Sequence, residues 1–176
     1  MMTKKQRGFS LIELLIVVAI ILIIAAISVP NLLRSRMAAN EASAVGSIRT
    51  INTAVTEYAL TYGGYPASLA QLGGTTGTAV GCNGAGLIDS VLSAGIKSGY
   101  SVALIPGTQP APPSSVPSGC TAGFSDGYVV TAVPVAVGSS GGRAFCSDAS
   151  GVIRSNPTGT VSYTSPVCSP TQSPLQ

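Results

Sequence analysis

The sequence contains no histidine, and only 9% of its 176 residues are charged. Without histidine it has no means of building a Ser-His-Asp triad, a histidine metal site or a histidine general base. Its six acidic residues are scattered, so no close carboxylate pair is available to share general acid and base roles. Neither a Walker phosphate-binding loop nor a dinucleotide-binding fingerprint occurs. We therefore predict a protein that is not an enzyme and uses no cofactor and no metal.

Charge is missing altogether from one long segment, Leu14 to Leu33, which is dominated by Ile, Leu, Val and Ala. About 20 residues of helix span about 30 Å, the thickness of the hydrocarbon core of a bilayer. The segment therefore predicts a membrane-spanning helix, and Lys4, Lys5 and Arg7 before it favour a cytoplasmic N-terminal end. A cleaved secretory signal peptide is the alternative, but Ala25-Ala26-Ile27 is a poor cleavage site.

One acid, Glu13, lies at the beginning of this apolar region. An acid in a membrane segment costs at least ~2.5 kcal/mol and usually has a function. It either lies near the interface, where it reaches water or is protonated, or pairs with a positive charge inside a protein bundle. Composition alone favours neither interpretation.

The segment Gly8-Phe9-Ser10-Leu11-Ile12-Glu13-Leu14 resembles the processing motif of type IV prepilins and pseudopilins. The resemblance is close over residues 1–65, and the short leader with Phe9 is similar to the type IVa group. It implies that prepilin peptidase cuts between Gly8 and Phe9 and methylates the new amine of Phe9. It also implies that Glu13 pairs with the terminal amine of a neighbouring subunit during assembly, and that Pro30 kinks the helix.

Removal of residues 1–8 would change the net charge of the chain. Three of the nine basic residues lie there, which leaves six basic residues against six acidic ones. A chain with neutral side chains overall is not expected to bind nucleic acid through net charge. Neutrality also suits a subunit that packs densely against copies of itself.

The helix is expected to continue beyond the membrane. Apolar residues recur every three or four positions on one face, as in an amphipathic helix: Val45, Ile48, Ile51, Val55, Tyr58 and Tyr62. Gly63-Gly64-Tyr65-Pro66 would end it. We thus expect one helix over residues 9–62, with a membrane half (9–33) and an amphipathic half (34–62). Pro30 would bend or locally unwind it, or else mark the end of a membrane helix.

Residues 63–176, here called the head, are expected to form a small antiparallel sheet, giving an α+β fold with a pilin-like long N-terminal helix. Pro134 suggests an edge strand or a bulge, and the tail after Asn156 is expected to be irregular. The expected elements are a short helix within 65–72, a helix over 87–94 with Leu87, Ile88, Val91 and Leu92 inward, strands at 100–105 and 128–137, and a hairpin of 144–147 with 152–154. A glycine-rich loop (73–86) and a proline-rich loop (106–119) join them.

The head contains four cysteines, Cys82, Cys120, Cys146 and Cys168, and no Cys-x-x-Cys pair. An even number beyond a membrane anchor favours disulfides in an oxidising compartment, and three pairings are possible. We favour Cys146–Cys168, which would pin the tail, with Cys82–Cys120. The segment from Asp148 to Gly151 is either part of a calcium loop or, as we prefer, a hairpin turn.

Three functions stay open. The first is a type IV pilin, a subunit of a homo-oligomeric filament. Its partners would be prepilin peptidase, the inner-membrane assembly machinery and, before assembly, membrane lipid. It would lie in the bacterial inner membrane as a precursor and in an extracellular pilus when assembled. The second is a pseudopilin of a type II secretion system, whose fibre stays in the periplasm. The third is a membrane-anchored binding module that never polymerises.

Overall fold

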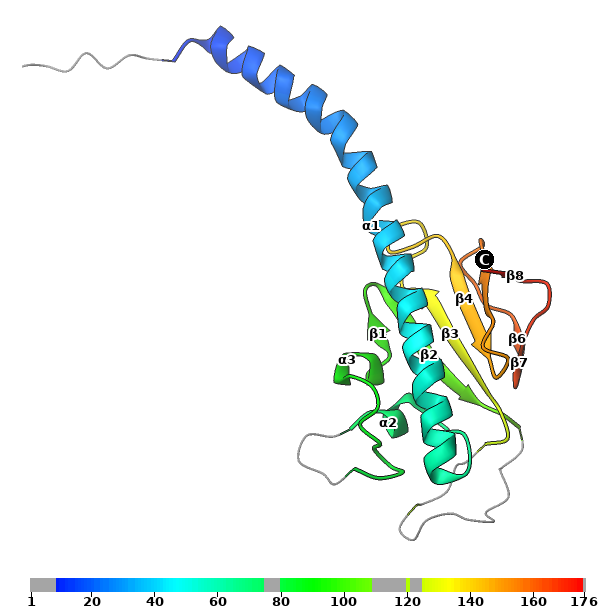
Figure 1. Ribbon diagram of the computed structural model, residues 1–176. Coiled ribbons are helices and arrows are strands. Elements are labelled where there is room, and N and C mark those ends of the chain that lie inside the picture. Colours follow the sequence, from blue (N-terminus) through cyan, green and yellow to red (C-terminus); the bar gives the residue numbers. More distant parts are fainter. Residues whose placement is uncertain (1–8, 75–79, 109–119, 121–124, 176) are drawn as a thin grey trace, which may run out of the picture. The chain divides into compact units, whose positions relative to one another are not determined.

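The computed structural model describes residues 9–74, 80–108, 120 and 125–175 (Figure 1). The chain divides after Arg36 into two compact units. Its elements, in chain order, are α1 (Leu11–Tyr62), α2 (Leu69–Leu72), α3 (Ser90–Ser93), β1 (Ile96–Lys97), β2 (Tyr100–Pro106), β3 (Tyr128–Pro134), β4 (Ala144–Asp148), β5 (Ile153–Asn156), β6 (Tyr163–Thr164), β7 (Val167–Cys168) and β8 (Ser173–Pro174). This is the expected α+β fold.

Helix α1 is 52 residues long. It begins at Leu11, whereas the sequence predicted a start at Phe9. The start is set by Ser10 and Glu13, because the Glu13 Oε2 accepts a hydrogen bond from the Ser10 backbone N–H at 3.0 Å. This contact is one half of a capping box, in which an acid three residues into the helix satisfies an otherwise unpaired donor. The helix ends at Tyr62, where Gly63 takes a positive φ of 83° and its N–H bonds the Ala59 carbonyl.

Pro30 lies inside α1, which continues to Tyr62. The alternative that Pro30 marks the end of the helix is therefore wrong. Proline lacks the N–H that would bond the carbonyl four residues earlier. The Asn31 side-chain amide donates to the Ile27 carbonyl at 3.1 Å, which adds a side-chain hydrogen bond to the helix next to the lost backbone one.

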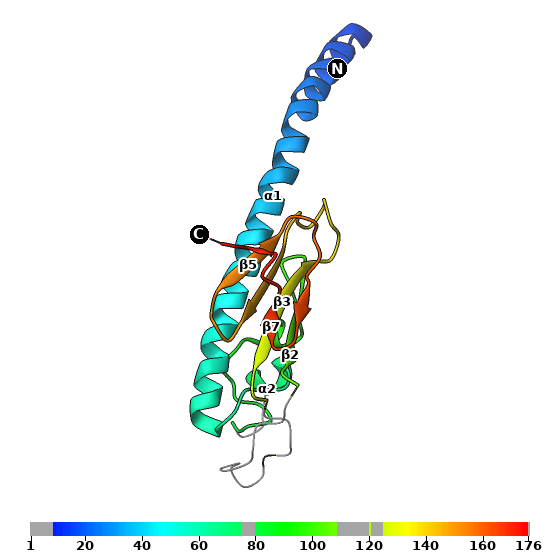
Figure 2. The same ribbon diagram turned by 90° about the vertical axis from the view of Figure 1, so that its right-hand side faces the viewer.

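In the second unit, α1 lies along one face of the sheet (Figures 1 and 2). The predicted apolar face of the helix is confirmed, since Ile48, Ile51, Val55 and Tyr58 are fully buried. They share one core with residues from four neighbouring strands: Tyr100, Val102, Leu104, Tyr128, Val130, Ala132, Phe145 and Ile153. Burying such side chains contributes about 1.5–3 kcal/mol each, which fixes the helix on the sheet.

The sheet has six strands in the order β1-β2-β3-β4-β5-β8, and its strand pairs are antiparallel. The predicted strand 128–137 ends at Pro134, and it is a central strand, so the expectation of an edge strand was wrong. Pro134 pairs with Tyr100 on β2, whereas the pairing with β4 stops at Ala132. The missing N–H of Pro134 therefore breaks no bond to β4.

Two other expectations for the head were wrong. Val91, expected to point inward, is 55% exposed. Helix α3 is a single turn that begins after Asp89, and the Asp89 side chain caps it by accepting the Leu92 N–H. Only Leu92 of that turn is buried. The tail after Asn156 is not irregular, since it adds β8 to the sheet and forms the β6–β7 hairpin. The two expected loops extend over residues 75–79 and 109–119, which lie outside the described residues.

Candidate functional site

The N-terminal end of α1 carries the residues of the processing motif. Gly8 lies outside the described residues, and Phe9 is 79% exposed just before the helix. Glu13 follows one turn later, and within the described residues its carboxylate accepts a hydrogen bond from the Ser10 N–H. Within that part of the chain, the two ion pairs are Lys97–Asp89 and Arg143–Glu41, so no basic side chain neutralises Glu13.

The first unit leaves its apolar side chains uncovered. From Phe9 to Leu33 the large apolar residues are about half exposed or more. Among the described residues one helix, α1, is long enough and apolar enough to cross a membrane. A continuous apolar surface of this size marks a site of contact with lipid or protein. Glu13 is thus a carboxylate placed among side chains that are built to be covered.

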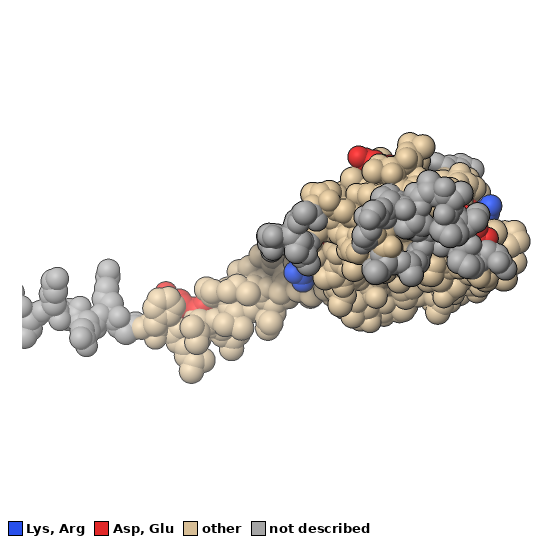
Figure 3. All heavy atoms as spheres, turned by 90° about the horizontal axis from the view of Figure 1, so that it is seen from below, with Lys and Arg blue, Asp and Glu red and all other residues tan. Residues whose placement is uncertain are grey.

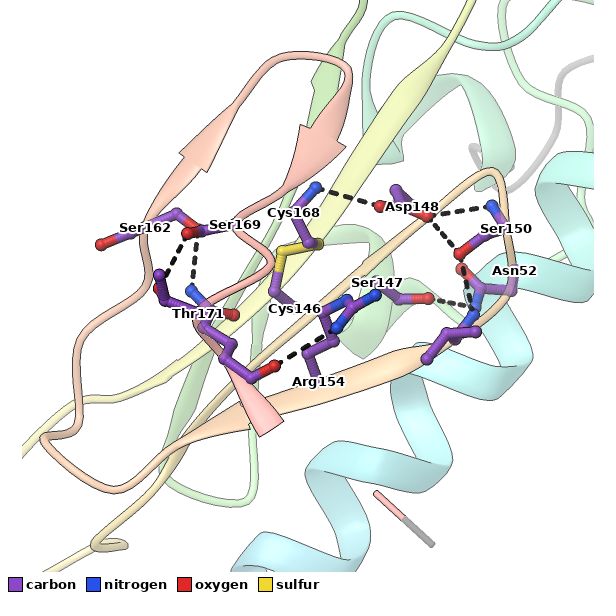
Figure 4. Close-up of a disulfide and its surroundings, with 12 residues drawn as sticks. Asn52, Cys146, Ser147, Asp148, Ser150, Arg154, Ser162, Cys168, Ser169 and Thr171 are labelled. Atoms are coloured by element: carbon purple, nitrogen blue, oxygen red, sulfur yellow. Dashed lines mark hydrogen bonds between the residues drawn. A yellow bond between two sulfur atoms is a disulfide. The ribbon is translucent and has the colours of Figure 1, made fainter. Parts of the chain in front are cut away.

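The disulfide between Cys146 and Cys168 is present, which confirms that predicted pairing. It joins β4 to β7 and lies in a second, smaller core, with Val129, on the sheet face opposite Phe145 (Figure 4). The two Cα atoms are 6.0 Å apart. The bond therefore holds the tail against the side of the sheet that α1 does not cover.

The structure also joins Cys82 to Cys120, with their Cα atoms 5.7 Å apart. Cys82 is buried, and its carbonyl accepts a hydrogen bond from the Tyr58 hydroxyl at 2.6 Å. The segment between α2 and α3 is thereby connected to α1.

Asp148 forms a turn next to the Cys146–Cys168 disulfide (Figure 4). Its Oδ1 accepts the backbone N–H and the hydroxyl of Ser150, and its Oδ2 accepts the Cys168 N–H at 3.0 Å. Burial raises the pKa of Asp148, but these bonds outweigh it and hold the pKa below its ordinary value. The bonds to Ser150 are those of the predicted hairpin turn, and the bond from Cys168 also links this turn to the tail. Within the described ranges, no three His, Cys, Asp or Glu side chains come together as metal ligands.

Glu41 and Arg143 form an ion pair that the sequence did not predict. Glu41 Oε1 accepts the N–H groups of Gly142 and Arg143, and Oε2 pairs with the Arg143 guanidinium at 2.8 Å. Burial raises the pKa of Glu41, yet these contacts hold it below the ordinary value. The two residues are 102 positions apart, so no local pattern connects them.

Comparisons with known proteins agree on the N-terminal region. A family model described as the prokaryotic N-terminal methylation motif matches residues 3–29. The chain is similar to the type II secretion system core protein G of Escherichia coli, with 39% identity over 64 residues, which are 36% of this chain and 44% of that protein. The corresponding protein G of Vibrio cholerae is 40% identical over 63 residues, covering 36% and 43%.

A type IV wide pilus major component, PilA4 of Thermus thermophilus, is 58% identical over 38 residues, covering 22% of this chain and 29% of that protein. The chain thus spans less than half the length of these curated relatives. No solved structure matches it significantly.

The matched motif contains Gly8, Phe9 and Glu13. It leads into a long apolar helix, and the second unit carries the antiparallel sheet that the resemblance implied. The N-terminal methylation motif and the named relatives support a type IV pilin or pseudopilin family for this chain.

Proposed function

We propose that this chain is a structural subunit of a type IV pilus. The observation that carries the proposal is Glu13, an acid without a basic partner in the described chain, on a stretch of α1 up to Leu33 whose large apolar side chains are uncovered. When helices of this kind pack together, their apolar side chains are buried against one another. A positive group beside Glu13 then compensates the charge of the buried carboxylate.

The mechanism of assembly follows from this arrangement. Prepilin peptidase cleaves the bond between Gly8 and Phe9 of a precursor held in the inner membrane, and Phe9 then carries a methylated, positive amine. The amine of one subunit pairs with Glu13 of the next as the apolar helices exchange lipid for helix contacts. In a low-dielectric filament core, removing either charge would leave the other one buried and unpaired, which is strongly destabilising.

A pseudopilin of a type II secretion system is the second candidate. It is favoured by the relatives named type II secretion system core protein G, which match longer stretches than the pilus component does. The stretch matched to the pilus component is the more similar one, at 58% identity. The two candidates use the same cleavage and the same Glu13 pairing, and they differ in whether the fibre leaves the periplasm.

Shearing of cells followed by mass spectrometry of the N-terminus tests the proposal. We expect sheared surface filaments that contain this chain with a methylated Phe9 terminus. The same terminus in the membrane fraction alone would favour the pseudopilin. An uncut leader in a host with prepilin peptidase would overturn both and leave the anchored binding module.

The Glu13→Val variant separates processing from assembly. We expect it to be cleaved after Gly8 but to give few filaments, whereas Glu13→Asp, which keeps the charge, should retain part of the yield. Filaments of Glu13→Val at the yield of the unaltered chain would contradict the proposed role of Glu13.

A further inference from the structure

The outward face of α1 in the second unit carries two charges without an ionic partner. Arg49 and Glu57 are both exposed, and neither belongs to the two ion pairs of the described residues. Leu60, one turn after Glu57, is 85% exposed. Figure 3 shows how few charged side chains appear on the face that it displays. On a surface so poor in charge, two opposite charges on one helix face are a specific feature.

The polar side chains between and around these charges are turned back onto the helix. Four threonine hydroxyls each donate to the backbone carbonyl four residues earlier, at 2.9–3.1 Å. Their acceptors are the carbonyls of Gly46, Arg49, Asn52 and Glu57, in the order Thr50, Thr53, Thr56 and Thr61. Because these hydroxyls already have acceptors, another surface can cover this face without leaving them unpaired.

Arg49 borders a groove of about 330 Å³ in the same unit. Its apolar lining includes Ala42, Val45 and Leu175, and Leu175 is held there by its N–H bond to the Ile153 carbonyl at 2.8 Å. Glu41 and Arg143 also line it, but they neutralise each other at 2.8 Å. Arg49 is therefore the one charge lining the groove that has no ionic partner among the described residues.

We propose that the groove beside Arg49 receives the Glu57–Leu60 end of α1 from a second copy of this chain, so that Glu57 of one copy pairs with Arg49 of the next. The proposal rests on the proposed function and adds a specific contact between subunits to it. The groove offers a positive charge without an ionic partner and the apolar side chains of Ala42, Val45 and Leu175, and the end of the helix offers a negative charge without one and an exposed leucine.

The positions of the two charges determine the kind of interface. Arg49 and Glu57 are eight residues apart, about 12 Å along a helix, so they do not pair within one copy. The groove and the helix end are different surfaces, so each copy uses one surface toward each neighbour. Such a head-to-tail contact repeats without closing unless its rotation makes a ring.

Charge reversal in the full-length chain tests the inference, with sheared filament yield as the measurement. Arg49→Glu and Glu57→Arg each place like charges together, and we expect each to lower the yield about fivefold or more. The double variant Arg49→Glu/Glu57→Arg restores the pair and should return to within about twofold of the unaltered chain. Lys97→Glu, the control, reverses one exposed charge of the Lys97–Asp89 pair within one copy, leaves the Asp89 cap of α3 in place and should leave the yield unchanged.

Disulfide crosslinking gives an independent measurement. In filaments of Arg49→Cys/Glu57→Cys, we expect a ladder of multimers on a non-reducing gel, because each copy links to two neighbours. Either single cysteine variant should give no ladder and no dimer, since the contact joins position 49 to position 57. Dimers from one single variant would show a symmetric contact and overturn the inference.

The outcomes also separate this inference from the proposed function. If filaments with methylated Phe9 form, but both reversals keep full yield and the double cysteine variant gives no ladder, the contact is refuted and the pilin function stands. If the unaltered chain gives no filaments at all, the proposed function fails, and the contact fails with it.

Discussion

The side-chain amide of Asn52 on α1 donates a hydrogen bond to the hydroxyl of Ser147 on β4, at 2.8 Å (Figure 4). The Tyr128 hydroxyl on β3 lies 3.4 Å from the other end of the same amide. Ser147 is fully buried, so its hydroxyl depends on Asn52 for this bond. The helix and two central strands are thus joined by polar atoms inside an apolar core.

This contact predicts an asymmetry between single and double variants. Asn52→Ala should lower the free energy of unfolding by about 1–3 kcal/mol, because the buried Ser147 hydroxyl loses its partner. Asn52→Ala/Ser147→Ala removes both partners and should cost less than the sum of the two single changes. Denaturant unfolding of the detergent-solubilised chain measures all three. Additive effects would show that the bond does not couple helix and sheet.

Gly141 is predicted to tolerate no side chain. A Cβ at this position would meet the Tyr100 hydroxyl and lie 2.7–2.8 Å from two atoms of its ring. Tyr100 is fully buried and donates to the Arg143 carbonyl at 2.8 Å, so it has no room to retreat. Gly141→Ala should therefore cost about 1–3 kcal/mol of stability.

Gly81→Ala is the control for this change. Nothing lies within 4 Å of a Cβ at Gly81, so we expect a small effect. Equal stability of the two variants in the same denaturant assay would contradict the predicted clash.

Stability is predicted to fall at alkaline pH. Burial raises the pKa of Tyr58, Tyr100 and Tyr128 to about 12 each, above the ordinary value of 10.0. A phenol whose pKa is raised in the folded state makes its full contribution to the free energy of unfolding below pH 10. This contribution is lost as the pH rises from 10 through 12. Phenolate absorbance and unfolding, followed together, should change in this range. Titration of all six tyrosines near pH 10 in the folded chain would contradict the prediction.

Loss of the Cys146–Cys168 disulfide is predicted to loosen the tail. The bond closes a stretch of 22 residues, and Cys146→Ala/Cys168→Ala should cost about 2–4 kcal/mol. Hydrogen exchange should then speed up in the β6–β7 hairpin, whose strand β7 lies against β4 and β3. Protection of that hairpin at the level of the unaltered chain would show that its hydrogen bonds, such as the one from Cys168 N to Asp148, hold it without the disulfide.

The parts of the fold that follow from local pattern were predictable. The buried face of α1 repeats at helical spacing from Ile48 to Tyr58, and Asp148 to Gly151 carries the residues of a turn. Strands β6, β7 and β8 have two residues each, which is too short to show an alternation of apolar and polar positions. Their place depends on the disulfide and on pairing with distant strands.

The candidate site divides in the same way. The motif around Gly8, Phe9 and Glu13 is local, so one stretch of sequence displays it. Glu41 and Arg143 meet only because α1 packs on the sheet, and the groove beside Arg49 needs Leu175 from the other end of the chain. A surface that is assembled from residues far apart in the chain leaves no local pattern by which a single sequence would predict it.

The two disulfides also set how far one subunit lengthens when it is pulled. Cys82–Cys120 and Cys146–Cys168 enclose 38 and 22 residues, and neither loop extends under load while its bond is intact. At about 3.5 Å per residue, they withhold roughly 130 Å and 75 Å of contour length. A stretched subunit whose fold gives way would therefore extend only by the chain outside the two loops, and a reducing agent would release the remainder.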